Sequence, residues 1–561
     1  MAAPLPVSVR KFKQSKPEPR PGSGQPRNPP PAAALALQAE AAFHAGDRAR
    51  AEDLFRQAVR IDPDLAGAWL GLGREAVQQG RHAEGHGCFR RGIAGADFTL
   101  RALPGNRPSH VARAGCYDGL CQPPEAAESA RRALAIAPDP DLHRMLLCLM
   151  YFLPDTTPEA QYAEACRWDS LYAAPLAPGI RPHANAPLPE RRIRLGYLSP
   201  DLYNHAIVRF IQPVLEHHDR SRFEVFAYSV GATEDEDTGR ARAAVEHFVP
   251  FRGSGEDLAE RIRADGIDIL VELAGPTMPW EFLQTLALKP APIQVSWVGM
   301  PGTTGLSSMD YFLGDARLPC PGTEHLFRET VYRLPRVSCC YRPAGAFPVA
   351  PSPCLQRGYI TFGSFNQPRK ITREVARLWS AILRAVPRSR LLLKYKGMES
   401  EVFQDRFRSW FAKEGVARDR LQFAGGTPLA EYLAAYGEID IALDPFPHNG
   451  GSTSLDTVYM GVPLVTLTGR LPMQCAGASL LRTIGLSDMV AETPERYLET
   501  AVSMAGIVPK TPDIRRNVRQ ALLSSPFLDE AGAVRDLEDA FRDMWRRWCR
   551  GEDPRALRKA G

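Results

Sequence analysis

The sequence predicts helical repeats followed by two consecutive doubly wound α/β domains. Three observations support this fold class. Alanine-rich helical sequence near the N-terminus repeats at a fixed interval, a proline-rich segment follows it, and short apolar strands then alternate with helices in two successive series. Repeated helical pairs are typical of a solenoid, and strands that alternate with helices are typical of parallel sheets.

Composition limits the classes of protein that fit. The 561 residues leave room for three or four domains, and a net charge of +5 gives no reason to propose nucleic acid as the main partner. No apolar run reaches the length of a membrane span, and no apolar signal core opens the chain. The 11 scattered cysteines form no C-x-x-C pair, so we expect neither a disulfide framework nor a zinc site. A cytoplasmic location fits best.

Residues 1–32 combine many prolines with several lysines and arginines. This composition predicts a disordered tail, and a weak organelle address is the alternative.

Residues 33–174 are predicted to form tetratricopeptide-like helical repeats. Phe55 and Phe89 are 34 residues apart, and Gly46 and Gly80 repeat the same interval. A third unit, 126–138, is displaced by an insertion. Small residues let paired helices approach, and the aromatic residue fills the gap between neighbouring pairs. Such stacks form a groove that usually binds protein, whereas three unrelated helical hairpins would be the alternative.

After a linker at 175–190 we predict a first Rossmann-like domain at 191–350, a second at 351–524, and a C-terminal helix and tail at 525–561. The strands expected in the first are 193–198, 223–229, 267–273, 293–298 and 331–334, and those in the second are 359–365, 390–395, 421–424, 439–443 and 464–467. In the final helix one stripe is apolar and is expected to be core: Leu537, Phe541, Met544, Trp545 and Trp548.

A glycine turn in the second series is the strongest indication of function. Gly450 and Gly451 lie between the strand at 439–443 and a helix expected at 453–460. Glycines let backbone N–H groups approach a ligand, and the helix dipole favours an anion at the same point. Thr453 is expected to cap the helix. The turn therefore predicts a cradle for the phosphates of an activated sugar. In the alternative, a plain capping box, Asp456 binds only the backbone.

Three further segments end strands of the two predicted sheets. His205 follows the first strand, where it can take or position a proton, although a lone loop histidine is often structural. Arg369 and Lys370 follow the first strand of the second sheet and can neutralise a departing diphosphate, or they form a solvated basic turn. The segment 301–305 can line an acceptor pocket or simply end a strand.

Five ordered motifs, together with the repeats that precede them, resemble the O-linked N-acetylglucosamine transferase and SPINDLY-like family over about residues 35–550. The motifs are His205, Ala291-Pro292-Ile293-Gln294, Pro301-Gly302-Thr303-Thr304-Gly305, Phe365-Asn366-Gln367 with Lys370-Ile371, and the segment from Asp444 to Asp456. The resemblance implies a GT-B fold that needs no metal and no cofactor. It also implies transfer of a sugar from a nucleotide sugar to Ser or Thr of an acceptor protein that the repeats present.

The same resemblance implies a role for each matching residue. Lys370 would stabilise the leaving diphosphate with Gln367 beside it, and His205 would face the reacting sugar. The donor would be held by Gly450, Gly451, Ser452 and Thr453 at its phosphates, by Asp456 at its ribose and by Tyr432 at its base. Pro301, Gly302 and Thr303 would lie on the acceptor side.

Several positions depart from the family pattern around the predicted donor pocket. They are Ala206-Ile207 after the histidine, Pro276, Tyr432 and Gln474. UDP-N-acetylglucosamine is the family default, and these changes leave the base and sugar open. GDP-fucose and, for flagellin glycosylation, a CMP-nonulosonic acid are alternative donors. A catalytically silent scaffold is the alternative from another class.

Overall fold

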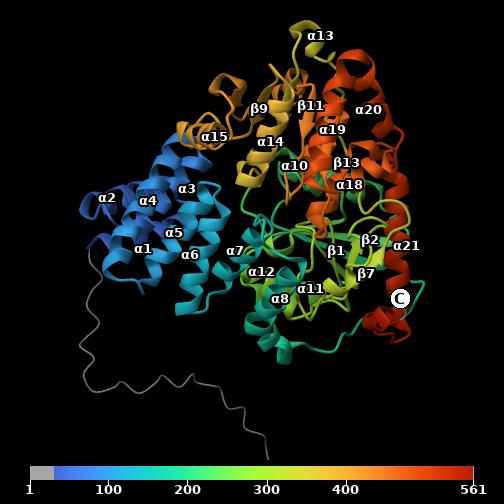
Figure 1. The fold of residues 1–561 in the computed structure, drawn as a ribbon. Coiled ribbons are helices and arrows are strands. Elements are labelled where there is room, and N and C mark those ends of the chain that lie inside the picture. Colours follow the sequence, from blue (N-terminus) through green and yellow to red (C-terminus); the bar gives the residue numbers. More distant parts are fainter. Residues whose placement is uncertain (1–30, 560–561) are drawn as a thin grey trace, which may run out of the picture.

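The computed structural model describes residues 31–559, which form a helical N-terminal part and two parallel-sheet domains (Figure 1). The N-terminal part contains α1 (Pro31–His44), α2 (Arg48–Ile61), α3 (Ala66–Gln78), α4 (His82–Ala102), α5 (Arg107–Gly119), α6 (Pro123–Ile136), α7 (Pro140–Met150) and α8 (Pro158–Trp168). The predicted tail lies outside the described residues except for its last two positions, which already belong to α1.

Aromatic side chains and glycines hold the helical pairs together, as the repeat interval predicts. Phe55 of α2 is fully buried against Gly71 of α3, where a Cβ would collide with its ring. Phe89 of α4 lies in the same way between Gly73 of α3 and Gly119 of α5. Any larger residue at these glycines would push neighbouring pairs apart. The predicted helical repeats are thus confirmed.

The first sheet domain has seven parallel strands in the order β3-β2-β1-β4-β5-β6-β7. They are β1 (Ile193–Ser199), β2 (Phe223–Ser229), β3 (His247–Pro250), β4 (Ile269–Glu272), β5 (Ile293–Ser296), β6 (Tyr311–Gly314) and β7 (Thr330–Arg333). Between them lie α9 (Val208–His217), α10 (Glu236–Ala243), α11 (Gly255–Ala264) and α12 (Trp280–Ala287).

The second sheet domain has six parallel strands in the equivalent order β10-β9-β8-β11-β12-β13. They are β8 (Thr361–Ser364), β9 (Arg390–Lys394), β10 (Leu421–Ala424), β11 (Ile441–Leu443), β12 (Leu464–Leu467) and β13 (Val490–Ala491). Its helices are α13 (Cys354–Arg357), α14 (Arg373–Ala385), α15 (Glu401–Lys413), α16 (Leu429–Ala434), α17 (Ser452–Tyr459), α18 (Pro472–Thr483), α19 (Pro494–Ile507) and α20 (Ile514–Leu523). Both orders are those of doubly wound sheets, which confirms the predicted fold class.

All ten predicted strands are present, and sequence analysis missed β3, β6 and β13. Strand β3 is a mostly exposed edge strand that begins with His247, β6 ends in Gly314 after only three apolar residues, and β13 has two residues. Runs this short give no clear strand period.

The last helix, α21 (Glu530–Cys549), returns from the second domain to the first, as its course along one side of the molecule in Figure 1 shows. Leu537, Phe541, Met544 and Trp545 are buried in the core of the first sheet domain, and Trp548 packs against it. The predicted apolar stripe is therefore core. No helix among the described residues combines the length and the apolar character that a membrane span requires.

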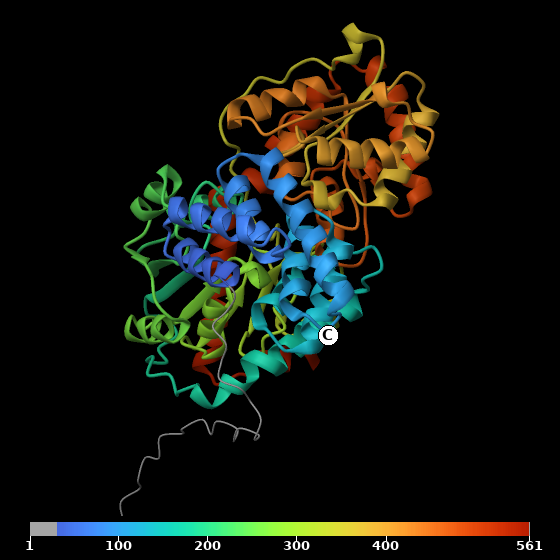
Figure 2. The ribbon, with the colours of Figure 1, turned by 90° about the vertical axis from the view of Figure 1, so that its left-hand side faces the viewer.

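The helical repeats dock on the second domain and share its core. Phe89 and Leu120 belong to the same buried apolar cluster as Trp379 and Phe407, and the ring of His86 stacks on Phe403 of α15 at 4.1 Å. Figure 2 shows the repeats in front of the first sheet domain and reaching up to the lower edge of the second. The repeats and the second sheet domain therefore share one hydrophobic core.

One disulfide joins the two sheet domains, contrary to the expectation from cysteine spacing. Cys320 follows β6 of the first domain, Cys475 lies in α18 of the second, and their Cα atoms are 6.6 Å apart. The two residues are 155 positions apart, so no local spacing could reveal the pair.

We expect this pairing to be visible in the number of reactive thiols. When the protein is unfolded and alkylated without reductant, nine cysteines should be modified, because nine are free in the structure. Prior reduction should raise the number to the full 11. Peptide mass spectrometry checks the result, and alkylation of Cys320 and Cys475 without reduction would contradict it.

Candidate functional site

The candidate site lies at the carboxyl ends of β8 and β11. These neighbouring strands mark the point where the strand order of the second sheet reverses, since the chain runs from β8 to one edge and from β11 to the other. Loops on either side of such a point diverge and leave a crevice in which ligands bind. The loop after β8 carries Lys370, and the loop after β11 carries the glycine turn.

A buried carboxylate at the end of β11 holds the glycine turn in place. Asp444 is fully buried and accepts a hydrogen bond from the backbone N–H of Gly450 at 2.7 Å and from the hydroxyl of Thr466 at 2.8 Å. Burial raises the pKa of Asp444 to about 6, although these hydrogen bonds oppose the shift. The N–H of Gly450 therefore points into the protein, and the prediction that it faces an anion is wrong.

The ligand-facing donors are instead the first amides of α17. The helix begins at Ser452 with Gly451 as N-cap, so Thr453 lies inside the first turn and does not cap it as predicted. Among the described residues, the N–H groups of Gly451, Ser452 and Thr453 have no hydrogen-bond acceptor. The hydroxyls of Ser452 and Thr453 are partly exposed beside them. Free amides at a helix N-terminus form an anion site.

Lys370 reaches this turn from the other loop. Its ammonium group donates to the backbone carbonyl of Asn449 at 2.7 Å and lies 3.4 Å from the Oδ1 atom of Asn366. Burial lowers the pKa of Lys370 to about 8, and the charge of Asp444 opposes this shift. The structure thus brings Lys370 and the α17 amides together at one point. The role of Lys370 in stabilising a diphosphate stays a prediction.

Asp456 lies one turn into α17, is almost fully buried and points toward the first sheet domain. Its Oδ1 atom accepts hydrogen bonds from Arg209 of α9 and from the hydroxyl of Tyr341, and its Oδ2 atom lies 3.5 Å from the hydroxyl of Tyr432. The alternative in which Asp456 binds only the helix backbone is therefore wrong. The carboxylate belongs to an interdomain network at the place where the donor ribose is predicted.

Tyr432 and Gln367 lie at the rim of the same crevice. Tyr432 of α16 is half-buried, its hydroxyl is 2.9 Å from that of Tyr436, and its ring is 5.9 Å from that of Phe365. Gln367 is exposed after β8. Both positions suit the predicted contacts with base and diphosphate, and those contacts stay predictions.

His205 lies apart from the other candidates. Its side chain is 46% exposed, and its nearest acidic partner is Asp201 at 4.0 Å. Within the described part of the chain its side chain contacts only residues of its own loop. Arg209, four residues further along the chain, reaches Asp456, so the loop of His205 lies close to the contact between the two sheet domains.

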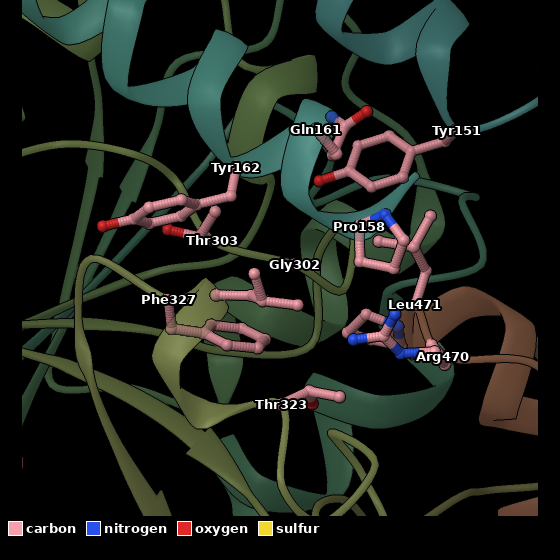
Figure 3. A pocket seen from close by; sticks show the side chains of 12 residues that line it. Tyr151, Pro158, Gln161, Tyr162, Gly302, Thr303, Thr323, Phe327, Arg470 and Leu471 are labelled. Carbon is pink, nitrogen blue, oxygen red and sulfur yellow. The ribbon is translucent and has the colours of Figure 1, made fainter. Parts of the chain in front are cut away.

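Of the predicted acceptor-side residues, Gly302 and Thr303 are buried and packed against other parts of the protein. Thr303 is buried and donates its hydroxyl to Glu329 at 2.7 Å, and a Cβ at Gly302 would collide with the hydroxyl of Tyr151. Gly302 and Thr303 nevertheless line a small cavity where α8, the first domain and the start of α18 converge (Figure 3). Pro301 precedes them in the same half-buried turn.

Sequence analysis missed contacts that come from the segment after α7. The ring of Phe152 stacks in parallel on that of His448 in the glycine turn at 4.5 Å. The guanidinium of Arg369, next to Lys370, lies 5.5 Å from the Phe152 ring and 3.1 Å from Asp118 of α5. His448 was part of the predicted turn, but nothing in the sequence identified Phe152 as its partner. The helical part therefore supports both loops of the candidate site.

Comparisons with known proteins agree with this architecture. A family model described as glycosyl transferase family 41 matches residues 178–336 and 354–537. A probable UDP-N-acetylglucosamine–peptide N-acetylglucosaminyltransferase SPINDLY of Solanum lycopersicum is 37% identical over 418 residues, which are 73% of this chain and 44% of that protein. The SPINDLY protein of Arabidopsis thaliana is 38% identical over 376 residues, 65% of this chain and 41% of that one.

A solved structure, a mutant of the Thermobaculum terrenum O-GlcNAc transferase, is similar with a TM-score of 0.83 and 34% identity, and the match covers 93% of this chain and 98% of that one. The chain thus spans less than half the length of the two curated relatives and nearly all of the solved one. The match confirms the predicted arrangement of helical repeats followed by a GT-B fold.

The contact between Phe152 and His448 predicts that Phe152, which follows α7 and belongs to neither sheet domain, affects ligand binding at the glycine turn. Replacing Phe152 by leucine keeps an apolar side chain but removes the stacked ring, so binding of a nucleotide at the glycine turn should weaken about tenfold, the effect of one aromatic pair. Calorimetric titration measures the affinity. The matched control is Phe98→Leu, since Phe98 is 60% exposed on α4. Equal affinities for Phe152→Leu and the unaltered chain would contradict the prediction.

The lowered pKa of Lys370 predicts a pH dependence of nucleotide binding. Below its pKa of about 8 the lysine is charged and attracts a diphosphate. Above that pH the free protein must first take up a proton, so the dissociation constant should rise by up to about tenfold for each further pH unit. Titrations between pH 6.5 and 9.5 measure this change. Lys370→Met should bind weakly at every pH, and an unchanged alkaline slope in that variant would assign the effect to another group.

Proposed function

The chain belongs to glycosyl transferase family 41, and we propose that it transfers a sugar from a nucleotide-sugar donor to Ser or Thr side chains of an acceptor protein. The observation that carries this proposal is the meeting of three groups at one crevice. They are the free amides at the start of α17, the ammonium of Lys370 and, one helical turn away, the carboxylate of Asp456. Together they match a diphosphate joined to a ribose.

In the proposed reaction the hydroxyl oxygen of the acceptor attacks the anomeric carbon of the donor sugar. The new C–O bond forms as the bond to the leaving phosphate breaks, and the hydroxyl proton leaves the acceptor. The charge that develops on the leaving phosphate falls on Lys370 and on the amides of Ser452 and Thr453, which are already in place before the reaction. His205 lies close to the contact between the two sheet domains and is proposed to take or position the proton.

UDP-N-acetylglucosamine is the proposed donor, because the curated relatives are named for it. The departures from the family pattern do not remove the diphosphate site. Gln474 uses its side chain to accept from the N–H groups of Arg470 and Leu471, and the carbonyl of Pro276 accepts from Arg144 of α7 at 3.1 Å. Both are structural contacts. Of these three departures, Tyr432 is therefore the one that can affect which nucleotide base is bound. GDP-fucose and CMP-nonulosonic acids stay as alternative donors.

We also propose that the helical part presents the acceptor protein to the cleft. The repeats lie in front of the first sheet domain and reach the second, and α8 lines the cavity next to Gly302 and Thr303 (Figures 2 and 3). The reaction is proposed to need no metal. Among residues 31–559 no three His, Cys, Asp or Glu side chains are gathered in a way that would hold one. A silent scaffold is less favoured, because Lys370 and Asp456 are charged groups with little exposure to solvent. Burying a charged group costs free energy, and a protein without a ligand at this site would gain nothing from that cost.

Two measurements test the proposal. Thermal unfolding with UDP, GDP and CMP identifies the base, since only a nucleotide that binds the folded state raises the melting temperature. Turnover of the corresponding nucleotide sugar is then followed with Ser- and Thr-containing peptides. Lys370→Ala should lower turnover on the order of a hundredfold or more, because it removes a charge that faces the leaving group.

The control is Lys413→Ala, an exposed lysine of the same domain. It should leave turnover unchanged. Near-normal turnover by a folded Lys370→Ala variant would remove the proposed role, and the absence of any nucleotide effect on melting would favour the scaffold.

A further inference from the structure

Arg209 is a residue of the first sheet domain whose side chain ends in the predicted donor site of the second. It is the second residue of α9 and follows directly after the loop of His205. Its guanidinium pairs with the carboxylate of Asp456, and the two side chains are only 19% and 5% exposed. The pair therefore crosses the cleft with little access to water.

Tyr341, from the segment that connects the two sheets, completes this contact. Its hydroxyl donates to Asp456 and lies 3.2 Å from a guanidinium nitrogen of Arg209. The backbone fixes its position, because the N–H of Tyr341 donates to the carbonyl of Phe527 at 2.7 Å and the N–H of Arg342 donates to the carbonyl of Arg209 at 2.8 Å. Three separate parts of the chain thus meet at one carboxylate.

The two oxygens of that carboxylate are used unequally. Oδ1 accepts from both Arg209 and Tyr341. Among residues 31–559, Oδ2 has only the hydroxyl of Tyr432, at 3.5 Å, the outer limit of a hydrogen bond. Each carboxylate oxygen can accept two hydrogen bonds. Oδ2 therefore keeps capacity for the hydroxyl of a ligand while Oδ1 anchors the group.

A carboxylate with so little exposure to solvent needs a positively charged partner to stay ionised. Burial raises the pKa of Asp456, and Arg209 and the hydroxyl of Tyr341 lower it. The other titratable groups around it are Tyr432 and Tyr436, and the pKa values of all three tyrosines are raised by burial, so none ionises near neutral pH. A protonated Asp456 would lose part of its capacity to accept.

Resting on the proposed function, we propose that Arg209 is a positioning residue for the donor: it holds Asp456 ionised and oriented across the cleft so that Oδ2 can accept a ribose hydroxyl. The donor site is then complete only when the first sheet domain is aligned with the second. Arg209 acts through Asp456 and need not touch the donor.

The test compares nucleotide affinity in four variants of the full chain between pH 5.5 and 8. They are Arg209→Met, Arg209→Lys, Asp456→Asn and the double variant Arg209→Met with Asp456→Asn. The probe is whichever of UDP, GDP or CMP stabilises the unaltered protein. The control is Arg242→Met, because Arg242 pairs with Glu234 on the exposed surface of the same domain.

Arg209→Met should weaken binding at least about tenfold at neutral pH, the effect of one hydrogen bond to a charged group. Because the pKa of Asp456 then rises further, the loss of affinity on acidification should begin at a higher pH than in the unaltered protein. Arg209→Lys keeps a positive charge and should restore part of the affinity and of the pH profile. The double variant should bind no more weakly than Asp456→Asn alone, because both changes act on one carboxylate.

Two results would overturn the proposal while leaving the proposed function intact. The first is an Arg209→Met variant with the affinity and pH profile of the unaltered protein. The second is a double variant whose loss equals the sum of the single losses, since Arg209 would then act independently of Asp456. If the unaltered protein bound none of the three nucleotides, the proposed function would fail, and this inference with it.

Discussion

The site depends on one buried carboxylate, Asp444, at the carboxyl end of β11. Its oxygens accept from the N–H of Gly450 and from the hydroxyl of Thr466, and its charge lies near the ammonium of Lys370. A Cβ at Gly450 would strike Ser454, and one at Gly477 would strike Thr466 and Asp444 itself. The glycines are thus required by close packing around the carboxylate. Because the Gly450 amide is drawn inward, the next three amides are left to face the crevice.

The crevice is in the second sheet domain, yet neither of its walls comes from that domain alone. Phe152 and Asp118 of the helical part support His448 and Arg369 from one side, and Arg209 of the first domain reaches Asp456 from the other. The disulfide between Cys320 and Cys475 links the two sheets near the cavity lined by Gly302 and Thr303. The proposed acceptor-binding part and the proposed donor site are therefore joined by direct packing contacts, although the sequence divides them into separate units.

Features determined by local sequence were predictable, and features determined by distant contacts were not. The central strands are short and mostly buried, and the glycine turn lies between a strand and a helix, so both were found. The start of α17 was misplaced by one residue, because a glycine can take the N-cap position that threonine was expected to fill. The partners of Asp456 and His448 were out of reach, since Arg209 is 247 residues from Asp456 and Phe152 lies in another part of the fold. The same holds for the disulfide.

In the proposed donor site, the groups that face the phosphates are separate from the groups that lie near the base. Lys370 donates to two neutral oxygens, those of Asn449 and Asn366, and within residues 31–559 no carboxylate forms an ion pair with it. Burial lowers its pKa to about 8, and the charge of Asp444 opposes this shift only in part. In the proposed donor site, a phosphate would supply that counter-ion and would also accept from the free amides of α17. This attraction depends only on the phosphates. Discrimination between bases would then fall to the proposed rim, where the ring of Tyr432 lies 5.9 Å from that of Phe365 and its hydroxyl lies 3.5 Å from Asp456. Substitutions there can alter the donor without disturbing Asp444, Lys370 or the start of α17.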